Sequence, residues 1–186
     1  RSGSSGAGYR LNCLYGKLPR GGNLFGHRQG SGFKETRETA GCQAGADVVI
    51  TSRRAEEVAA VAAEVRALGR RALEMPGDLK KPGMPKELAE AAIAEFGRLD
   101  IWINNAGGTD DAHVQPMTVT TDDQMRDMLE LNLIAAAAGS REAALRMPNG
   151  GAIVNISSGA GMRAAPNTAA YAASKAALLN LTQTMA

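Results

Sequence analysis

The sequence has few cysteines and histidines and no long apolar run. It contains two cysteines, Cys13 and Cys42, and no histidine cluster beside them, so neither a disulfide framework nor a metal site is expected. No window approaches the roughly 18 consecutive apolar residues of a membrane span, and the first residues lack the apolar core of a signal peptide. The formal net charge of +2 is too small to imply a nucleic acid or an anionic membrane as partner. We therefore expect a soluble, cytoplasmic protein.

The chain divides near residue 45. Residues 1–44 are rich in Gly and Arg and show neither the strand period nor the helix period, whereas the rest has clear periodicity. Apolar runs with strand character cover residues 46–51, 71–75, 100–104 and 152–157, and helical patterns cover residues 54–68, 85–96, 121–140 and 167–185. Nearly continuous apolar strands that alternate with helices indicate a mostly parallel sheet covered on both faces. The predicted fold is α/β and doubly wound, with a partial domain over residues 45–186.

Sequence signals also mark individual helix ends. Gly69 stands where a C-terminal cap belongs, and Thr121 with Gln124 three residues later matches a capping box.

Tyr171 and Lys175 are the first candidates for chemistry. A spacing of four residues puts both on one helix face, where the ammonium favours the phenolate and makes the phenol usable for proton transfer. Ser158 lies thirteen positions upstream, just past a predicted strand, where its hydroxyl would reach a bound carbonyl. The alternatives are an exposed Tyr and Lys on an alanine-rich helix and a solvated loop Ser.

Two asparagine positions are the next candidates. Asn104-Asn-Ala-Gly107 closes a predicted strand with small residues that let a flat ligand approach the backbone, although the same residues also suit an ordinary turn. Asn132 lies in a predicted helix among leucines. Asn has a poor helix propensity, and a solvent-facing position is the alternative, but the apolar residues around it favour a buried polar role.

These motifs together resemble the short-chain dehydrogenase/reductase family. Asn104-Asn-Ala-Gly107, Asn132, Ile156-Ser-Ser158 and Tyr171-x-x-Ser-Lys175 occur in that family's order and spacing, and the resemblance covers about residues 45–186. It implies a Rossmann-type fold and a catalytic tetrad of Asn132, Ser158, Tyr171 and Lys175. In that family the Tyr is the general acid/base, the Lys holds the nicotinamide ribose, the Ser orients the substrate oxygen and the Asn holds a water.

The resemblance also implies contacts to a nicotinamide cofactor. They fall on Arg53, Asp78, Leu79, Asn104, Ala106, Gly107, Tyr171 and Lys175. Members that prefer NAD place an acidic residue after the second strand of the fold, where this chain has Ser52 followed by Arg53. Because a guanidinium suits a 2′-phosphate, NADP(H) is favoured over NAD(H), although Arg53 and Arg54 would also serve as a charged helix start.

Both ends depart from the family pattern. The family opens with a strand and a glycine-rich turn; Gly26, Gly30 and Gly32 keep nearly that spacing, but no β-branched strand precedes them. A reading-frame shift within residues 1–44 is one interpretation, because Phe25 to Gly30 can be encoded so that the next frame reads Ser-Val-Thr-Gly-Lys. The sequence stops at residue 186, before the family's remaining strands and substrate loop, so the fold is expected to be truncated at the C-terminus.

The resemblance therefore implies an oxidoreductase that transfers hydride between NADP(H) and a small carbonyl or alcohol substrate. Family members commonly pair two helices across a symmetry axis, here those at residues 121–140 and 167–185, which predicts a homodimer or homotetramer. The alternative is a catalytically inactive fragment or a binding-only relative.

Overall fold

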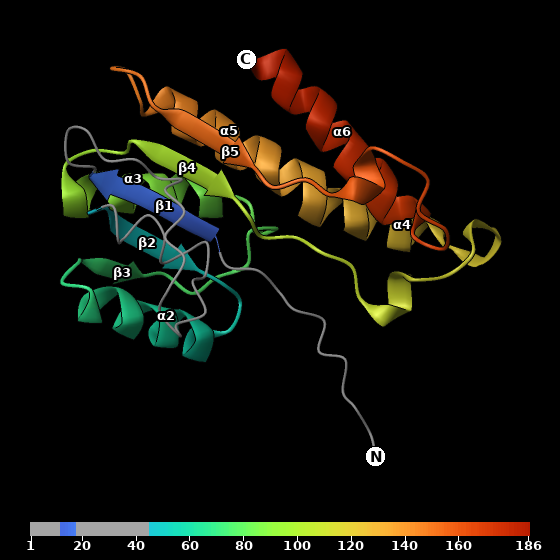
Figure 1. The fold of residues 1–186 in the computed structure, drawn as a ribbon, viewed down its shortest axis with the longest axis horizontal. Helices are drawn as coiled ribbons and strands as arrows, with labels where there is room; N and C mark the ends of the chain where they lie inside the picture. Colours follow the sequence, from blue (N-terminus) through green and yellow to red (C-terminus); the bar gives the residue numbers. More distant parts are fainter. Residues whose placement is uncertain (1–11, 18–44) are drawn as a thin grey trace, which may run out of the picture.

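A computed structural model describes residues 12–17, as backbone alone, and residues 45–186 (Figure 1). Five strands form one sheet in the order β3-β2-β1-β4-β5. The strands are β1 Asn12–Lys17, β2 Asp47–Thr51, β3 Ala72–Glu74, β4 Ile101–Asn104 and β5 Ala152–Asn155. The main helices are α2 Ala55–Ala67, α3 Met84–Phe96, α4 Asp122–Leu129, α5 Ala135–Leu145 and α6 Ala169–Met185. Short 3-10 turns lie at η1 Asp111–His113, η2 Met117–Val119 and η4 Gly159–Gly161.

The sheet is mostly parallel, as expected, with one reversed strand. β2 pairs with β3, and β4 with β5, in parallel, while β1 pairs antiparallel with both β2 and β4. The expectation that no strand forms in residues 1–44 was therefore wrong for Asn12–Lys17. Inner edges of β2 and β4 present rows of backbone N–H and C=O groups that require partners, and a six-residue segment without a strand-like sequence pattern supplies them.

Helices cover both faces of the sheet, which confirms the doubly wound architecture. Alternate residues of β2 point to opposite faces, as the strand period requires: Val48 and Ile50 pack with α2, and Val49 packs in the cluster that includes α3. The cluster on the α3 side also includes residues of α5 and Trp102 of β4. The Trp102 side chain is fully buried. Burying a large apolar side chain of this kind stabilises a fold by roughly 1.5–3 kcal/mol.

The helix expected over residues 121–140 begins as expected, but it is interrupted by a π-helical turn and ends later, at Leu145. Its predicted capping box forms, because the Thr121 hydroxyl accepts from the Gln124 N–H and the Gln124 side chain accepts from the Thr121 N–H. A π-helical turn, η3 Glu130–Ile134, then separates α4 from α5, and α5 continues to Leu145. Turns of this kind occur often at functional sites, and this one contains Asn132.

Helix α2 ends as the sequence indicates, with Leu68 as its C-cap and Gly69 in the left-handed region at φ 73°. Helix α6 begins at Ala169, two residues later than expected, after Asn167 adopts a left-handed φ of 62°. Within the described part of the chain, none of the helices combines the length and the apolar character needed to cross a membrane.

Candidate active site

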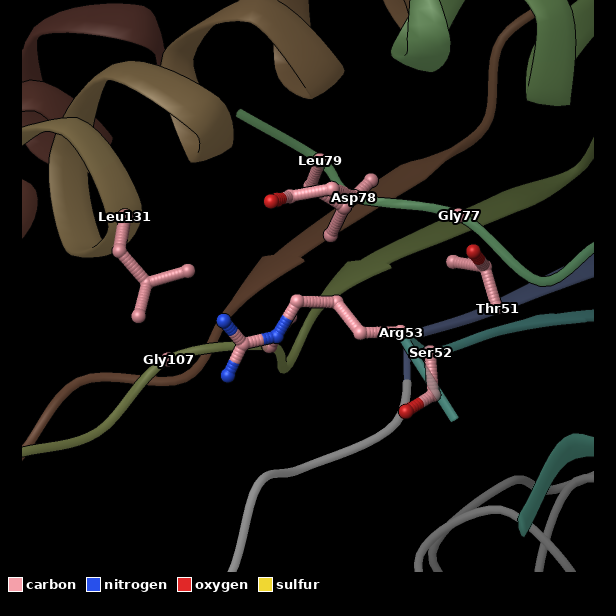
Figure 2. Close-up of a pocket in the computed structure, with 9 residues that line it drawn as sticks. Thr51, Ser52, Arg53, Gly77, Asp78, Leu79, Gly107 and Leu131 are labelled. Atoms are coloured by element: carbon pink, nitrogen blue, oxygen red, sulfur yellow. The ribbon is translucent and has the colours of Figure 1, made fainter. Parts of the chain in front are cut away.

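Two neighbouring pockets lie at the carboxyl ends of the strands, the edge where open α/β sheets bind ligands. The first is lined from three strand ends and the π turn (Figure 2). Its lining residues are Thr51, Ser52, Arg53, Gly77, Asp78, Leu79, Ala106, Gly107 and Leu131. Five of the sequence-predicted cofactor contacts, Arg53, Asp78, Leu79, Ala106 and Gly107, therefore meet in one cavity.

Two charged side chains reach into this first pocket. Figure 2 shows the Arg53 side chain extending across the cavity, with its guanidinium on the side of Gly107 and Leu131, while the Ser52 hydroxyl points away from it. The Ser52 hydroxyl donates to Glu57 at 3.1 Å. Asp78 Oδ1 accepts from the Lys80 N–H at 3.0 Å, which fixes the turn after β3. The pocket thus has a cation and an anion at its two sides.

The second pocket adjoins the first at Gly107, which lines both. Its walls are Asn105, Gly107, Gly108, Thr109, Ile156, Ser157, Tyr171 and Lys175. Tyr171 and Lys175 lie one turn apart on α6, and Lys175 Nζ is 5.9 Å from the centroid of the Tyr171 ring. The Lys175 side chain is buried and Nζ donates to the Ile156 carbonyl at 2.9 Å. The pair proposed from sequence therefore lies at the wall of a cavity and not on an exposed helix face.

Asn132 lies directly behind this wall. It is 1% exposed, which confirms the expectation that it is buried. Its Oδ1 accepts from the Gly108 N–H at 2.9 Å, and its Nδ2 donates to the Gly108 carbonyl at 3.0 Å and to the Met128 carbonyl at 3.1 Å. This one side chain thus joins the π turn to the loop that follows β4.

Gly107 cannot carry a side chain where it stands. Its φ is 150°, and a Cβ there would lie 2.7 Å from Asn132 Oδ1 and 3.2 Å from Lys175 Nζ. The absence of a side chain is what keeps the shared wall of the two pockets open to a flat ligand.

Two of the residues proposed from sequence lie elsewhere. Asn104 is buried beside Trp102, and its Nδ2 donates to the Ala136 carbonyl and to the side chains of Ser140 and Asn155. Its amide is therefore used to join β4 to α5 and β5, and the residue lines neither pocket. The two-residue strand period from the buried Trp102 places Asn104 on the face that α5 covers, and this signal could have separated Asn104 from the pocket residues.

Ser158 caps a turn in this structure. Its hydroxyl accepts from the Ala160 N–H at 3.2 Å, whereas the neighbouring Ser157 lines the second pocket and donates to the Lys175 carbonyl at 3.0 Å. Other lining residues missed by the sequence reasoning are Leu131, Asn105, Gly108 and Thr109. Their positions next to the quoted motifs were the signal that could have found them. Gly26, Gly30 and Gly32 lie outside the described residues.

Known proteins resemble this chain in sequence and in fold. A family model described as short chain dehydrogenase matches residues 25–186. The chain belongs to this family. An uncharacterised oxidoreductase of Mycobacterium tuberculosis is 40% identical over 159 residues, which are 83% of this chain and 59% of that protein. This short-chain dehydrogenase therefore spans about three fifths of that relative's length.

Solved structures of the family share the fold. A metagenomic short-chain oxidoreductase in complex with NADP has a TM-score of 0.71 and 33% identity, over 77% of this chain and 65% of the other. Carveol dehydrogenase from Mycobacterium avium in complex with NAD has a TM-score of 0.76 and 26% identity, over 80% of this chain and 58% of the other. The solved structures that resemble this chain thus include one complex with NADP and one with NAD.

One buried polar group at the wall of the first pocket lacks a partner in the part of the chain that the structure describes. Thr51 is 1% exposed at the pocket wall, and among the described residues its hydroxyl has no hydrogen-bond partner. A buried hydroxyl of this kind is costly unless something pairs with it.

Proposed function

We propose that the protein is an NADP(H)-dependent oxidoreductase that interconverts a small carbonyl compound and its alcohol. The observation that carries this proposal is the pair of pockets joined at Gly107. One pocket presents Arg53 and Asp78 to a nucleotide, and the other presents Tyr171 and Lys175 to a reacting group. A bound nicotinamide supplies or accepts the hydride; the remaining chemistry is a proton transfer, which falls to the protein.

Tyr171 is the group that would move the proton. Its phenol lies at the pocket wall on α6, and during reduction it would donate to the oxygen of the substrate carbonyl. The buried Lys175 ammonium, held by the Ile156 carbonyl, favours the phenolate that remains. Returning the proton to Tyr171 from the alcohol describes the reverse reaction.

The other predicted residues would position these two. Asn132 fixes the Gly108 backbone behind the pocket. The hydroxyl that orients the substrate oxygen would come from the Ser157–Ser158 pair. Ser158 was proposed from sequence, and because its oxygen only accepts from the Ala160 N–H, its hydroxyl proton could still be donated to a substrate oxygen. Arg53 would bind the 2′-phosphate of NADP(H), because its guanidinium already extends into the first pocket, the one that would hold the cofactor.

The test compares the purified protein with Tyr171→Phe. NADPH oxidation is followed by its absorbance across a panel of small ketones and aldehydes, and NADPH affinity is measured by calorimetry. Loss of the phenolic proton is expected to lower kcat by about 10²–10⁴-fold, while the dissociation constant for NADPH stays the same because the ring still packs. Wild-type protein that binds NADPH without turnover on any carbonyl would support the binding-only alternative. A Tyr171→Phe variant as active as wild type would show that another group is the acid.

A further inference from the structure

A row of four charged or polar side chains connects the two pockets across α4. Lys80, two residues after Asp78 of the cofactor pocket, pairs with Asp127 of α4 at 2.7 Å between Nζ and Oδ1. Asp127 Oδ2 lies 3.9 Å from His113 Nε2. His113 Nδ1 then hydrogen-bonds the carboxylate of Asp110. Asp110 directly follows Thr109, which lines the second pocket.

His113 is the best-buried member of this row. Its side chain is 13% exposed, whereas the side chains of Lys80, Asp127 and Asp110 are 28%, 43% and 36% exposed. Ion pairs between exposed groups contribute little to stability because water screens them. The contact between His113 and Asp110 is therefore the one expected to have the largest effect.

The segment that carries His113 has little apolar packing of its own. Val114, Met117 and Val119 are 46%, 57% and 59% exposed. Polar contacts hold the segment instead: the Gln124 side chain donates to the Ala112 carbonyl at 3.0 Å, and the Gln115 N–H donates to the Asn167 carbonyl at 2.7 Å. Removing one such contact should loosen the segment noticeably.

The Asp110 carboxylate is suited to this role. The hydrogen bond from His113 is the main reason why the pKa of Asp110 lies below its ordinary value, and partial burial opposes this lowering. Asp110 thus stays ionised at neutral pH, and the bond to His113 is charge-assisted, which makes it stronger than a neutral hydrogen bond.

We propose that His113 is a positioning residue for the substrate side of the site: by its bond to Asp110, and by facing Asp127 of α4, it holds the loop of Gly107, Gly108 and Thr109 in place to receive the carbonyl substrate. The role in catalysis rests on the proposed function. The role in holding the loop does not, and the two can be measured separately.

The test uses three variants of the full chain. His113→Ala removes the contact, and His113→Asn keeps a donor near the position of Nδ1. Arg126→Ala is the matched control, because it removes ion pairs to Asp122 and Asp123 on the exposed face of α4, the helix that carries Asp127. Hydrogen–deuterium exchange of the amides of residues 107–116, without ligand, is expected to be about tenfold or more faster in His113→Ala, as for loss of one charge-assisted hydrogen bond. His113→Asn and Arg126→Ala should exchange like wild type.

Steady-state kinetics then separates positioning from general loosening. In His113→Ala we expect KM for the carbonyl substrate to rise about tenfold, with a smaller change in kcat and none in the melting temperature beyond that of Arg126→Ala. His113→Asn should restore KM. Unchanged exchange in His113→Ala, or faster exchange with unchanged KM, would overturn the proposal. Wild-type protein without turnover would refute the proposed function, and the exchange comparison would still decide whether His113 holds the loop.

Discussion

Asn132 hydrogen-bonds both backbone polar groups of Gly108, accepting from its N–H at 2.9 Å and donating to its carbonyl at 3.0 Å. The contact joins residues that are 24 apart in sequence. It fixes the loop after β4 against the π turn, so the wall shared by the two pockets is held from behind by one amide. Both substrate-side and cofactor-side geometry should therefore depend on Asn132.

Replacing Asn132 by alanine should destabilise the protein and impair catalysis together. The change leaves the Gly108 N–H and carbonyl without their partner in a partly buried place; the cost is about 1–3 kcal/mol for a fully buried unsatisfied group and is set by how far water reaches these two groups. Urea unfolding should show a loss of this size. The control is Asn180→Ala on the exposed side of α6, which is expected to stay within about 0.5 kcal/mol of wild type. Equal unfolding midpoints for the two variants would contradict the assigned role.

Replacing Arg53 by alanine should change cofactor preference. If its guanidinium binds the 2′-phosphate, the variant loses a charge-assisted contact that only NADP(H) offers. We expect KM for NADPH to rise at least tenfold, the change that corresponds to about 1.4 kcal/mol, while KM for NADH changes little. Arg54→Ala, which breaks an ion pair to Glu57 on the exposed start of α2, is the comparison variant. Equal KM values for NADPH and NADH in the wild-type protein would refute the preference.

Asp47 should make the stability of the protein dependent on acid pH. The carboxylate is 5% exposed and pairs with Arg70 at 2.6 Å and Arg71 at 2.9 Å. Burial raises the pKa of Asp47, but hydrogen bonds from the Arg71 backbone and side chain, with the attraction of both guanidinium groups, outweigh it and leave the pKa lowered. The unfolded chain therefore binds the proton more readily than the folded one, so this stabilisation is present above about pH 4 and is lost as pH falls further.

Asp47→Asn tests that dependence. At pH 7 the variant should unfold with a free energy lower by about 2 kcal/mol, less than for a fully buried pair because the arginines are partly exposed. At pH 3 the difference should shrink toward zero. Chemical denaturation at both pH values measures it, and a difference that does not change with pH would contradict the assignment.

The protein is expected to form dimers or tetramers in solution. Leu178 and Ala135, which lie on the two helices expected to pair, are buried within the chain's own fold at 1% and 7% exposure. Ile134, in contrast, is 48% exposed at the end of the π turn. Ile134→Lys should shift the mass measured by light scattering toward the monomer. Leu68→Lys, a similarly exposed position beside α2, should not, and a monomeric wild-type protein at micromolar concentration would remove the idea.

Periodic patterns in the sequence predicted the main elements, and the resemblance to the family supplied most of the candidate site residues. Helical spacing placed Tyr171 and Lys175 on one face, and the leucines around Asn132 indicated that it is buried. Other features depend on contacts between distant segments. A local sequence period does not reveal the π turn. It also does not reveal that the Asn104 amide hydrogen-bonds α5 and β5. Nor does the sequence reveal that the Ser158 hydroxyl caps the turn after β5 while Ser157 lines the second pocket.

The reversal of β1 decides which part of the chain enters the sheet beside the ligands. Asn12 pairs with Thr51, a residue of the cofactor pocket, and Lys17 pairs with Asp47 at the far end of β2. A polypeptide fused directly ahead of Asn12 would thus be tethered at the edge that carries the first pocket, where its bulk would limit access to that pocket. One inserted just after Lys17 would be tethered about the length of a strand away. Placement of a purification tag or a fluorescent label on this protein is therefore a choice about access to the pocket.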